Sequence, residues 1–170
     1  FMYVAKMSGY ADAYDLFTPD LGELAFLADE KAPHPFYTRG FLLAREDDVP
    51  PLLQRALEHG NCPKNLIIKG SKDYIVVDGR VIATVDAPSV PAMECIGGTG
   101  DLVTGLVTAF LCGGAAMDEA CTAAARMARL LAQLCAPNPG TQIGELIEML
   151  PQAMRGARSA WPTTLSALSV

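Results

Sequence analysis

The feature that most constrains this chain is a glycine-rich turn that leads directly into an apolar helical stretch. Residues 94–114 read ECIGGTGDLVTGLVTAFLCGG, so three glycines and an aspartate precede apolar side chains at helical spacing. A helix N-terminus presents unpaired backbone N–H groups and the positive end of the helix dipole, which suit an anion. Glycines let a phosphate approach the backbone closely. The pattern therefore predicts an anion-binding turn ahead of a buried helix.

Two interpretations of the aspartate in this turn stay open from the residues alone. Asp101 can favour the helix dipole or cap the helix. Alternatively, Gly97, Gly98 and Gly100 hold a phosphate while Asp101 takes a proton from a substrate hydroxyl that attacks it. The turn is not a Walker A loop, because the Lys-Ser/Thr pair is absent. It is not a dinucleotide fingerprint either, because GxGxxG is not matched.

Composition excludes several classes of protein. The 170 residues are 51% hydrophobic, which fits one domain with a sizeable core. The net charge of -6 and the lack of a basic run argue against nucleic acid as a partner. The sequence contains neither an apolar run long enough to span a bilayer nor a basic segment followed by a signal-like core. We therefore expect a cytoplasmic protein with no membrane partner.

The cysteines are odd in number, form no CxxC pair and mostly lie among small apolar residues. They predict reduced thiols in the core, with neither a disulfide framework nor a zinc site. The five positions are Cys62, Cys95, Cys112, Cys121 and Cys135.

Periodicity and turn signals predict a layered α/β domain over residues 1–155, with a central sheet flanked by helices and a tail over 156–170. We expect four or five short strands. The predicted extended segments are 3–6, 15–18, 66–69, 74–77 and 81–85, the last two forming a hairpin around Asp78-Gly79. The predicted helices are 21–32, 46–59, 101–112, 118–135 and 141–154.

Four segments of the chain resemble motifs of one family. GGTGD resembles the GxGD motif of the ribokinase-like superfamily, and LFTPDLGELAFL resembles its TPHPGE segment. NLIIKGSKDYIVVDGRVI resembles its KGxxT strand and hairpin, and IGELIEMLPQAM its C-terminal helix. The segments occur in the family's order over about residues 15–154. Together they are similar to the ADP/ATP-dependent NAD(P)H-hydrate dehydratases, a carbohydrate-kinase-like family.

The resemblance implies a partial ribokinase-like fold and a reaction in two steps. ADP or ATP phosphorylates the hydroxyl of hydrated NADH or NADPH, and elimination of phosphate restores the nicotinamide ring. Asp101 matches the motif aspartate that acts on this hydroxyl, and Glu23 matches an acid near the phosphate and its Mg²⁺. The residues that match nucleotide-binding positions are Lys69, Gly70, Ser71, Lys72, Asp73, Gly97, Gly98, Thr99 and Gly100. Asn138 is a further candidate for a nucleotide contact, against the simpler interpretation of a proline-glycine turn.

The chain also departs from the family pattern. Asp20 and Leu21 replace the His-Pro pair, and Asp73 replaces the threonine of KGxxT, which places negative charge near the expected phosphate. Only the second half of the family's domain is recognisable. We therefore expect a homo-oligomer, or a partner segment that completes the sheet.

Two alternatives remain beside the dehydratase. One is a small-molecule kinase that uses the same anion hole on a hydroxylated metabolite such as a sugar or thiazole alcohol. The other is a shortened, inactive relative that serves as a nucleotide-binding or assembly module. Its support is the missing half and the changes at Asp20 and Asp73.

Overall fold

The computed structural model describes residues 1–29, 45–156 and 161–162. The chain divides into two compact units, the N-terminal unit of residues 1–83 and the C-terminal unit of residues 84–170. The single domain over 1–155 stays a prediction, and residues 30–32 of the predicted helix and most of the predicted tail lie outside the described residues.

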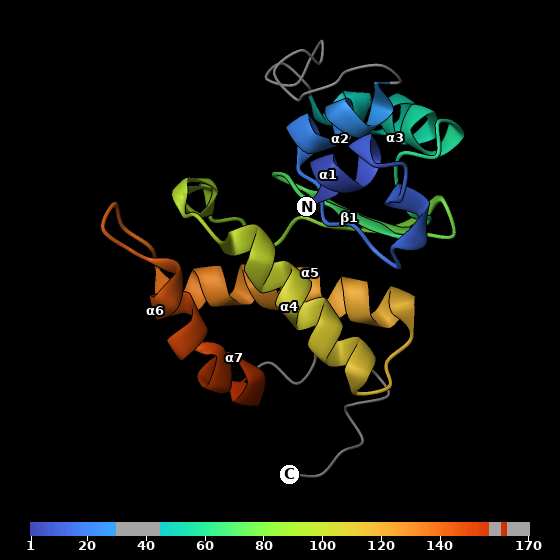
Figure 1. The fold of residues 1–170 in the computed structure, drawn as a ribbon. Helices are drawn as coiled ribbons and strands as arrows, with labels where there is room; N and C mark the ends of the chain where they lie inside the picture. Colours follow the sequence, from blue (N-terminus) through green and yellow to red (C-terminus); the bar gives the residue numbers. More distant parts are fainter. Residues whose placement is uncertain (30–44, 157–160, 163–170) are drawn as a thin grey trace. The chain divides into compact units, whose positions relative to one another are not determined.

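The N-terminal unit combines helices with a three-stranded sheet, which confirms the mixed α/β class (Figure 1). The sheet has the order β1-β2-β3, and Leu66 of β1 lies opposite Val76 of antiparallel β2. Its helices are α1 (Met2–Met7), α2 (Leu21–Ala28) and α3 (Val49–Glu58). Its strands are β1 (Leu66–Ile68), β2 (Asp73–Val77) and β3 (Arg80–Val85), the last continuing across the unit boundary.

The hairpin forms where the Asp-Gly pair predicted it. Asp78 and Gly79 both have positive φ, at 50° and 75°, which is the backbone of a two-residue type I′ turn. Asn65 fixes this turn from outside, because its Oδ1 accepts the Asp78 N–H at 3.1 Å. The prediction of a β2-β3 hairpin is therefore confirmed.

The segment before α2 runs along the free edge of β1 in parallel. Phe17 pairs with Leu66 and Asp20 pairs with Lys69 as isolated bridges. The Lys69 N–H donates to the Pro19 carbonyl at 2.8 Å. The predicted extended segment at 15–18 is confirmed, although the described residues contain three strands and these two bridges rather than four or five strands.

The extended segment predicted at residues 3–6 is wrong, because these residues belong to helix α1. A short apolar run cannot distinguish strand from helix by periodicity alone, so tertiary contacts decide. In α1 the residues Tyr3 and Lys6 are three apart and both contact Phe26 of α2. The contact with α2 thus favours the helical spacing.

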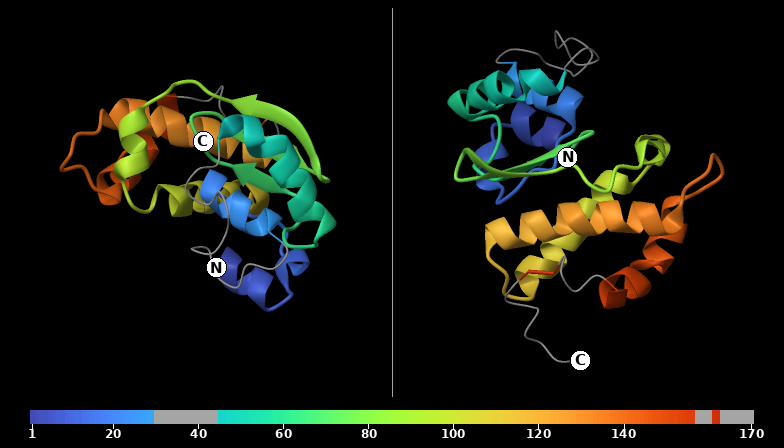
Figure 2. Two further views of the ribbon diagram at one scale, coloured as in Figure 1. Left: turned by 90° about the horizontal axis from the view of Figure 1, so that it is seen from above. Right: turned by 180° about the vertical axis from the view of Figure 1, so that it is seen from behind.

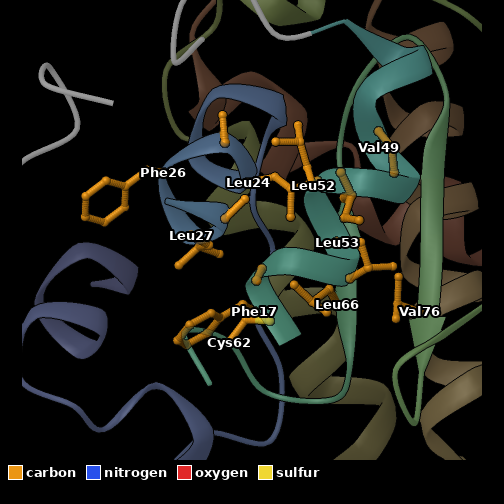
Figure 3. Packing of buried hydrophobic residues seen from close by; sticks show 14 of the residues in the cluster. Phe17, Leu24, Phe26, Leu27, Val49, Leu52, Leu53, Cys62, Leu66 and Val76 are labelled. Atoms are coloured by element: carbon orange, nitrogen blue, oxygen red, sulfur yellow. The ribbon is translucent and has the colours of Figure 1, made fainter. Parts of the chain in front are cut away.

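Helix α2 contributes much of the core of the N-terminal unit, since all five residues from Leu24 to Ala28 are buried. Figure 3 shows Leu24 beside Leu52 of α3, and Phe26 pointing away on the opposite side of the helix. An ordinary amphipathic helix would bury only one apolar face. The structure instead covers a second side, because Tyr3 packs edge-on against Phe26 with ring centroids 5.0 Å apart.

The C-terminal unit is helical in its described part. Helix α4 (Thr99–Cys112) packs across α5 (Met117–Cys135), as the view from behind in Figure 2 shows. Small alanine side chains buried on α5, including Ala120 and Ala124, allow neighbouring helices to approach it closely. Helices α6 (Ile143–Glu148) and α7 (Leu150–Gly156) also contact α5, and a short 3₁₀ helix at Pro91–Cys95 precedes α4.

The prediction of one continuous helix over 141–154 is wrong at its centre. Helix α6 ends at its C-cap Met149, and α7 begins with Leu150. Pro151 has no backbone N–H and its ring clashes with the preceding turn, so it is tolerated only in the first turn of a new helix. No helix in the described ranges combines the length and apolarity that a membrane span requires.

The prediction of core thiols holds only in part. Cys62 and Cys121 are buried, but Cys95 and Cys112 are exposed. Cys95 belongs to a 3₁₀ helix without buried residues, and Cys112 is the last residue of α4. Burial raises the pKa of Cys62 to about 12, and burial together with the charge of Asp118 raises the pKa of Cys121 to about 12.

Replacing Leu24 with alanine tests the role of α2 in the core. Leu24 is fully buried, so we expect Leu24→Ala to lower the free energy of unfolding by about 2–5 kcal/mol. Val4→Ala is the matched control, because Val4 is 64% exposed and its truncation should change stability by less than about 0.5 kcal/mol. Urea unfolding followed by circular dichroism measures both. Equal effects of the two variants would contradict this assignment of the core.

Thiol reactivity tests the placement of the cysteines. The thiolate is the reactive form, and a raised pKa leaves it scarce at pH 8, so Cys62 and Cys121 should resist a disulfide reagent in the native protein. Cys95 and Cys112 should react rapidly. Absorbance of the released thiol, with peptide mapping to locate the label, gives the result. All five cysteines should react after unfolding in guanidinium, and rapid native labelling of Cys62 would contradict the structure.

Candidate functional site

The glycine-rich turn forms the N-terminus of α4. Gly98 is the N-cap in the left-handed region, with φ 94°. Its carbonyl accepts the Leu102 N–H at 3.0 Å, so the N–H groups of Thr99, Gly100 and Asp101 precede the helical hydrogen-bond ladder. These N–H groups and the helix dipole make this end of α4 favourable for an anion.

The two glycines ahead of α4 have different surroundings. A Cβ on Gly98 would lie 3.2 Å from Ile143 Cγ1 at the start of α6, so this glycine permits a close approach between two helix ends. A Cβ on Gly97 would meet no described atom within 4 Å. Gly98 therefore serves packing and a positive φ, whereas Gly97 leaves open space in front of the helix.

Asp101 lies in the first turn of α4 and is exposed. The N-cap is Gly98 and not Asp101, so the interpretation of Asp101 as a cap is wrong. The interaction of its carboxylate with the helix dipole remains as the simpler interpretation. An exposed carboxylate beside unpaired N–H groups is placed to meet a ligand from solution. The proton transfer that the motif implies for Asp101 stays a prediction.

Asn138 lies in the turn that precedes α6 in the same unit. Its Oδ1 accepts the Gly140 N–H at 2.9 Å, and its own N–H donates to Thr141 Oγ1 at 3.0 Å. These bonds are those of a local Asx turn. They explain why asparagine stands here, and a nucleotide contact by Asn138 stays a prediction.

The second predicted loop, Lys69–Asp73, lies in the N-terminal unit. Asp73 is buried, and its Oδ1 accepts the Gly70 N–H at 3.3 Å, so the aspartate closes the turn in which the family has threonine. Lys72 Nζ lies 5.0 Å from the centroid of the Tyr74 ring. Ser71 is exposed and Lys69 is half-buried. The loop and the α4 turn belong to different units of the chain.

Asp20 and Glu23 form a capping box at the start of α2. The Glu23 N–H donates to Asp20 Oδ1 at 2.7 Å, and the Asp20 N–H donates to Glu23 Oε2 at 2.7 Å. Burial raises the pKa of Glu23; the hydrogen bond from Asp20 opposes this rise, the Asp20 charge adds to it and the Lys69 charge opposes it. The structure therefore brings Asp20, Glu23 and Lys69 together.

The pair of carboxylates fits a magnesium ion. Mg²⁺ prefers oxygen ligands and is usually held by one or two carboxylates, by substrate phosphates and by water. The capping box occupies Oδ1 of Asp20 and Oε2 of Glu23, so the second oxygen of each carboxylate lies outside it. Within the described ranges no cluster of three or more acidic, histidine or cysteine side chains forms a complete metal cage.

Sequence reasoning missed two residues at these positions. Burial and the charges of Glu23 and Asp20 raise the pKa of Tyr3 to about 12, and Ile143 packs over Gly98. Each lies far along the chain from its partner, so no local motif could reveal either one.

Alanine substitutions at the two glycines test their different surroundings. We expect Gly98→Ala to lower the free energy of unfolding by about 1–2 kcal/mol through the left-handed backbone alone, with crowding against Ile143 adding to it. Gly97→Ala, in open space, should stay within about 1 kcal/mol of wild type. Denaturant unfolding measures both variants. A Gly98→Ala protein as stable as wild type would contradict the packing described for this turn.

Comparison with known proteins identifies the family. A family model described as NAD(P)H-hydrate dehydratase matches residues 5–152. An uncharacterized protein of Methanocaldococcus jannaschii is 42% identical over 154 residues, and the bifunctional NAD(P)H-hydrate repair enzyme of Pyrobaculum aerophilum is 33% identical over 142 residues. These matches cover 90% and 82% of this chain but 66% and 25% of the two relatives.

No solved structure matches the chain. The resemblance inferred from the four sequence motifs is confirmed by the family model and by the Pyrobaculum relative. Because the family model spans most of the 170 residues, this chain belongs to the NAD(P)H-hydrate dehydratase family of carbohydrate-kinase-like proteins.

Proposed function

We propose that the chain takes part in nucleotide-dependent dehydration of NAD(P)H hydrate. In the first step the terminal phosphoryl group of ADP or ATP moves to the substrate hydroxyl oxygen, and AMP or ADP leaves. In the second step the C–O bond breaks, phosphate departs and the ring loses a proton as its double bond is restored. The observation that carries the proposal is the N-terminus of α4, where an exposed Asp101 accompanies three N–H groups ahead of the helical ladder.

The α4 turn supplies the chemistry that phosphoryl transfer requires. The N–H groups and the helix dipole stabilise negative charge on the transferred phosphoryl group, and the open position at Gly97 admits it. Asp101 accepts the proton of the attacking hydroxyl as the new P–O bond forms. The same face of the helix then holds the leaving phosphate during elimination.

The N-terminal unit supplies the groups for the nucleotide. Lys69 and the backbone of residues 70–73 are proposed to contact its phosphates, and Asp20 with Glu23 to hold Mg²⁺. The ion, when bound, neutralises phosphate charge. The burial of Asp73 against the Gly70 N–H supports this role for the loop, because the aspartate keeps the turn closed where the family uses threonine.

Nucleotide binding is the first test. Calorimetry follows the binding of ADP or ATP to the protein in the presence of Mg²⁺. The mass of the protein in solution is determined first, because we expect a homo-oligomer or a partner segment to complete the sheet. Gly97→Val should abolish binding, because its methyl groups fill the space in front of α4. Gly105→Val is the matched control, since Gly105 on the same helix also faces open space among the described atoms.

The outcomes separate the candidate functions. Loss of affinity in Gly97→Val but not in Gly105→Val supports the anion hole. No binding by the wild type would favour the inactive assembly module and overturn the proposal. Where binding is found, release of phosphate from hydrated NADH indicates the dehydratase, whereas a stable phosphorylated product indicates the small-molecule kinase.

The role of Asp101 is tested by Asp101→Asn, which keeps the shape of the side chain but removes the base. We expect the turnover number to fall by roughly 10²–10⁴-fold while nucleotide affinity changes little. Recovery of NADH absorbance from its hydrate measures turnover, and calorimetry measures affinity. Turnover equal to that of the wild type would leave Asp101 as a residue that only favours the helix dipole.

A further inference from the structure

Strand β3 forms an open edge of the sheet. The strand order is β1-β2-β3, and none of the backbone hydrogen bonds among the other described segments reaches β3. The opposite edge, at β1, is met by the segment before α2. Because the hairpin turn has two residues, every second residue of β3 directs its N–H and C=O away from β2. These residues are Val81, Ala83 and Val85.

The side chains of β3 are apolar and exposed at this edge. Ile82 is 49% exposed and Val81 is 43% exposed, and they point to opposite faces of the sheet because neighbouring strand residues alternate. In the adjacent β2, Ile75 and Val76 are fully buried. Proteins usually protect an edge strand with a charge, a proline or a bulge, yet residues 81–85 contain neither a charge nor a proline. Such an edge favours pairing with a further strand.

The sequence around β3 is complementary to itself in the antiparallel direction. Residues 80–86 read RVIATVD, and the side chains of Arg80 and Asp86 at its two ends are exposed. With Ala83 opposite its own copy, Arg80 of each chain lies opposite Asp86 of the other. Val81 then lies opposite Val85, and both direct their backbone groups toward the partner, so ladder hydrogen bonds can form.

Other alignments of two β3 strands lose this complementarity. A shift of two residues in either direction separates Arg80 from Asp86. Parallel pairing in register places each charge beside its like, which destabilises a strand pair. The charges at the two ends of the segment therefore select one antiparallel register.

We propose that β3 is the docking surface for a second copy of this chain, with the two β3 strands antiparallel about a twofold axis at Ala83. The two three-stranded sheets thereby become one continuous sheet. Charge complementarity identifies the occupant, because Arg80 and Asp86 satisfy each other only when the facing strand carries the same sequence. The inference does not depend on the proposed function.

Charge reversal tests the contact. Arg80→Asp places two carboxylates opposite each other at both ends of the paired strands, and Asp86→Arg places two guanidinium groups there. We expect each change to raise the dissociation constant of the dimer by about tenfold or more. Arg126→Asp is the matched control, since it makes the same exchange at an exposed arginine of α5 and should leave association unchanged. Analytical ultracentrifugation over a range of protein concentrations measures the mass.

Mixing the two variants tests the register. The Arg80→Asp chain carries only acidic groups at the two positions, and the Asp86→Arg chain carries only basic groups. An equimolar mixture should therefore recover most of the association that each variant alone has lost. The double variant Arg80→Asp/Asp86→Arg should recover it too, because both pairs are restored with their signs exchanged. Recovery requires folded chains, so it separates loss of the contact from loss of the fold.

Three results would overturn the proposal. One is a wild-type protein that stays monomeric at every concentration tested. Another is an oligomer whose association is unchanged in both charge-reversal variants, which would place the contact between copies elsewhere on the chain. The third is dissociation of both variants without recovery in their mixture, since Arg80 and Asp86 would then not face each other.

Discussion

The N-terminal unit depends on hydrogen-bond partners for the backbone groups at both ends of α2, a helix that is buried on more than one side. Helix α2 places Leu24 to Ala28 in the core, so the backbone carbonyls at its C-terminal end must find partners inside the protein. Lys6 and Asn61 donate to these carbonyls, with Asn61 Nδ2 2.8 Å from the Leu27 oxygen. At the more exposed start of the helix, the capping box of Asp20 and Glu23 supplies the partners. The carboxylates proposed to hold the metal are therefore also the ones that cap α2.

In the C-terminal unit, adjacent glycines divide the work of fold and function. Gly98 has a left-handed backbone that disfavours side chains, and a Cβ there would crowd Ile143, so the fold alone favours glycine at this position. Gly97 has neither constraint from the described atoms. A glycine without such a constraint, beside the start of a helix, supports the proposal that a ligand approaches the backbone there.

Much of the architecture could be predicted because local chemistry decides it. The Asp78-Gly79 turn, the proline-led start of α3 and the glycine turn before α4 each depend on residues that are neighbours in sequence. The helical state of α1 could not be predicted, because Phe26 selects it from a distance. At the candidate site, sequence identified the glycine-rich turn and Asp101 but missed the contact of Ile143 with Gly98 for the same reason. It also could not show that Asp73 is turned into its own loop.

The replacement of histidine by Asp20 changes the charge of the candidate metal site but preserves the helix start. Aspartate is among the best N-cap residues, and Asp20 accepts the Glu23 N–H as a cap should. Its cost is a second negative charge beside a carboxylate that is already partly desolvated, which raises the pKa of Glu23 further. Lys69 offsets part of this charge. A divalent cation would offset the rest, so the exchange of histidine for Asp20 is compatible with the proposed Mg²⁺ site.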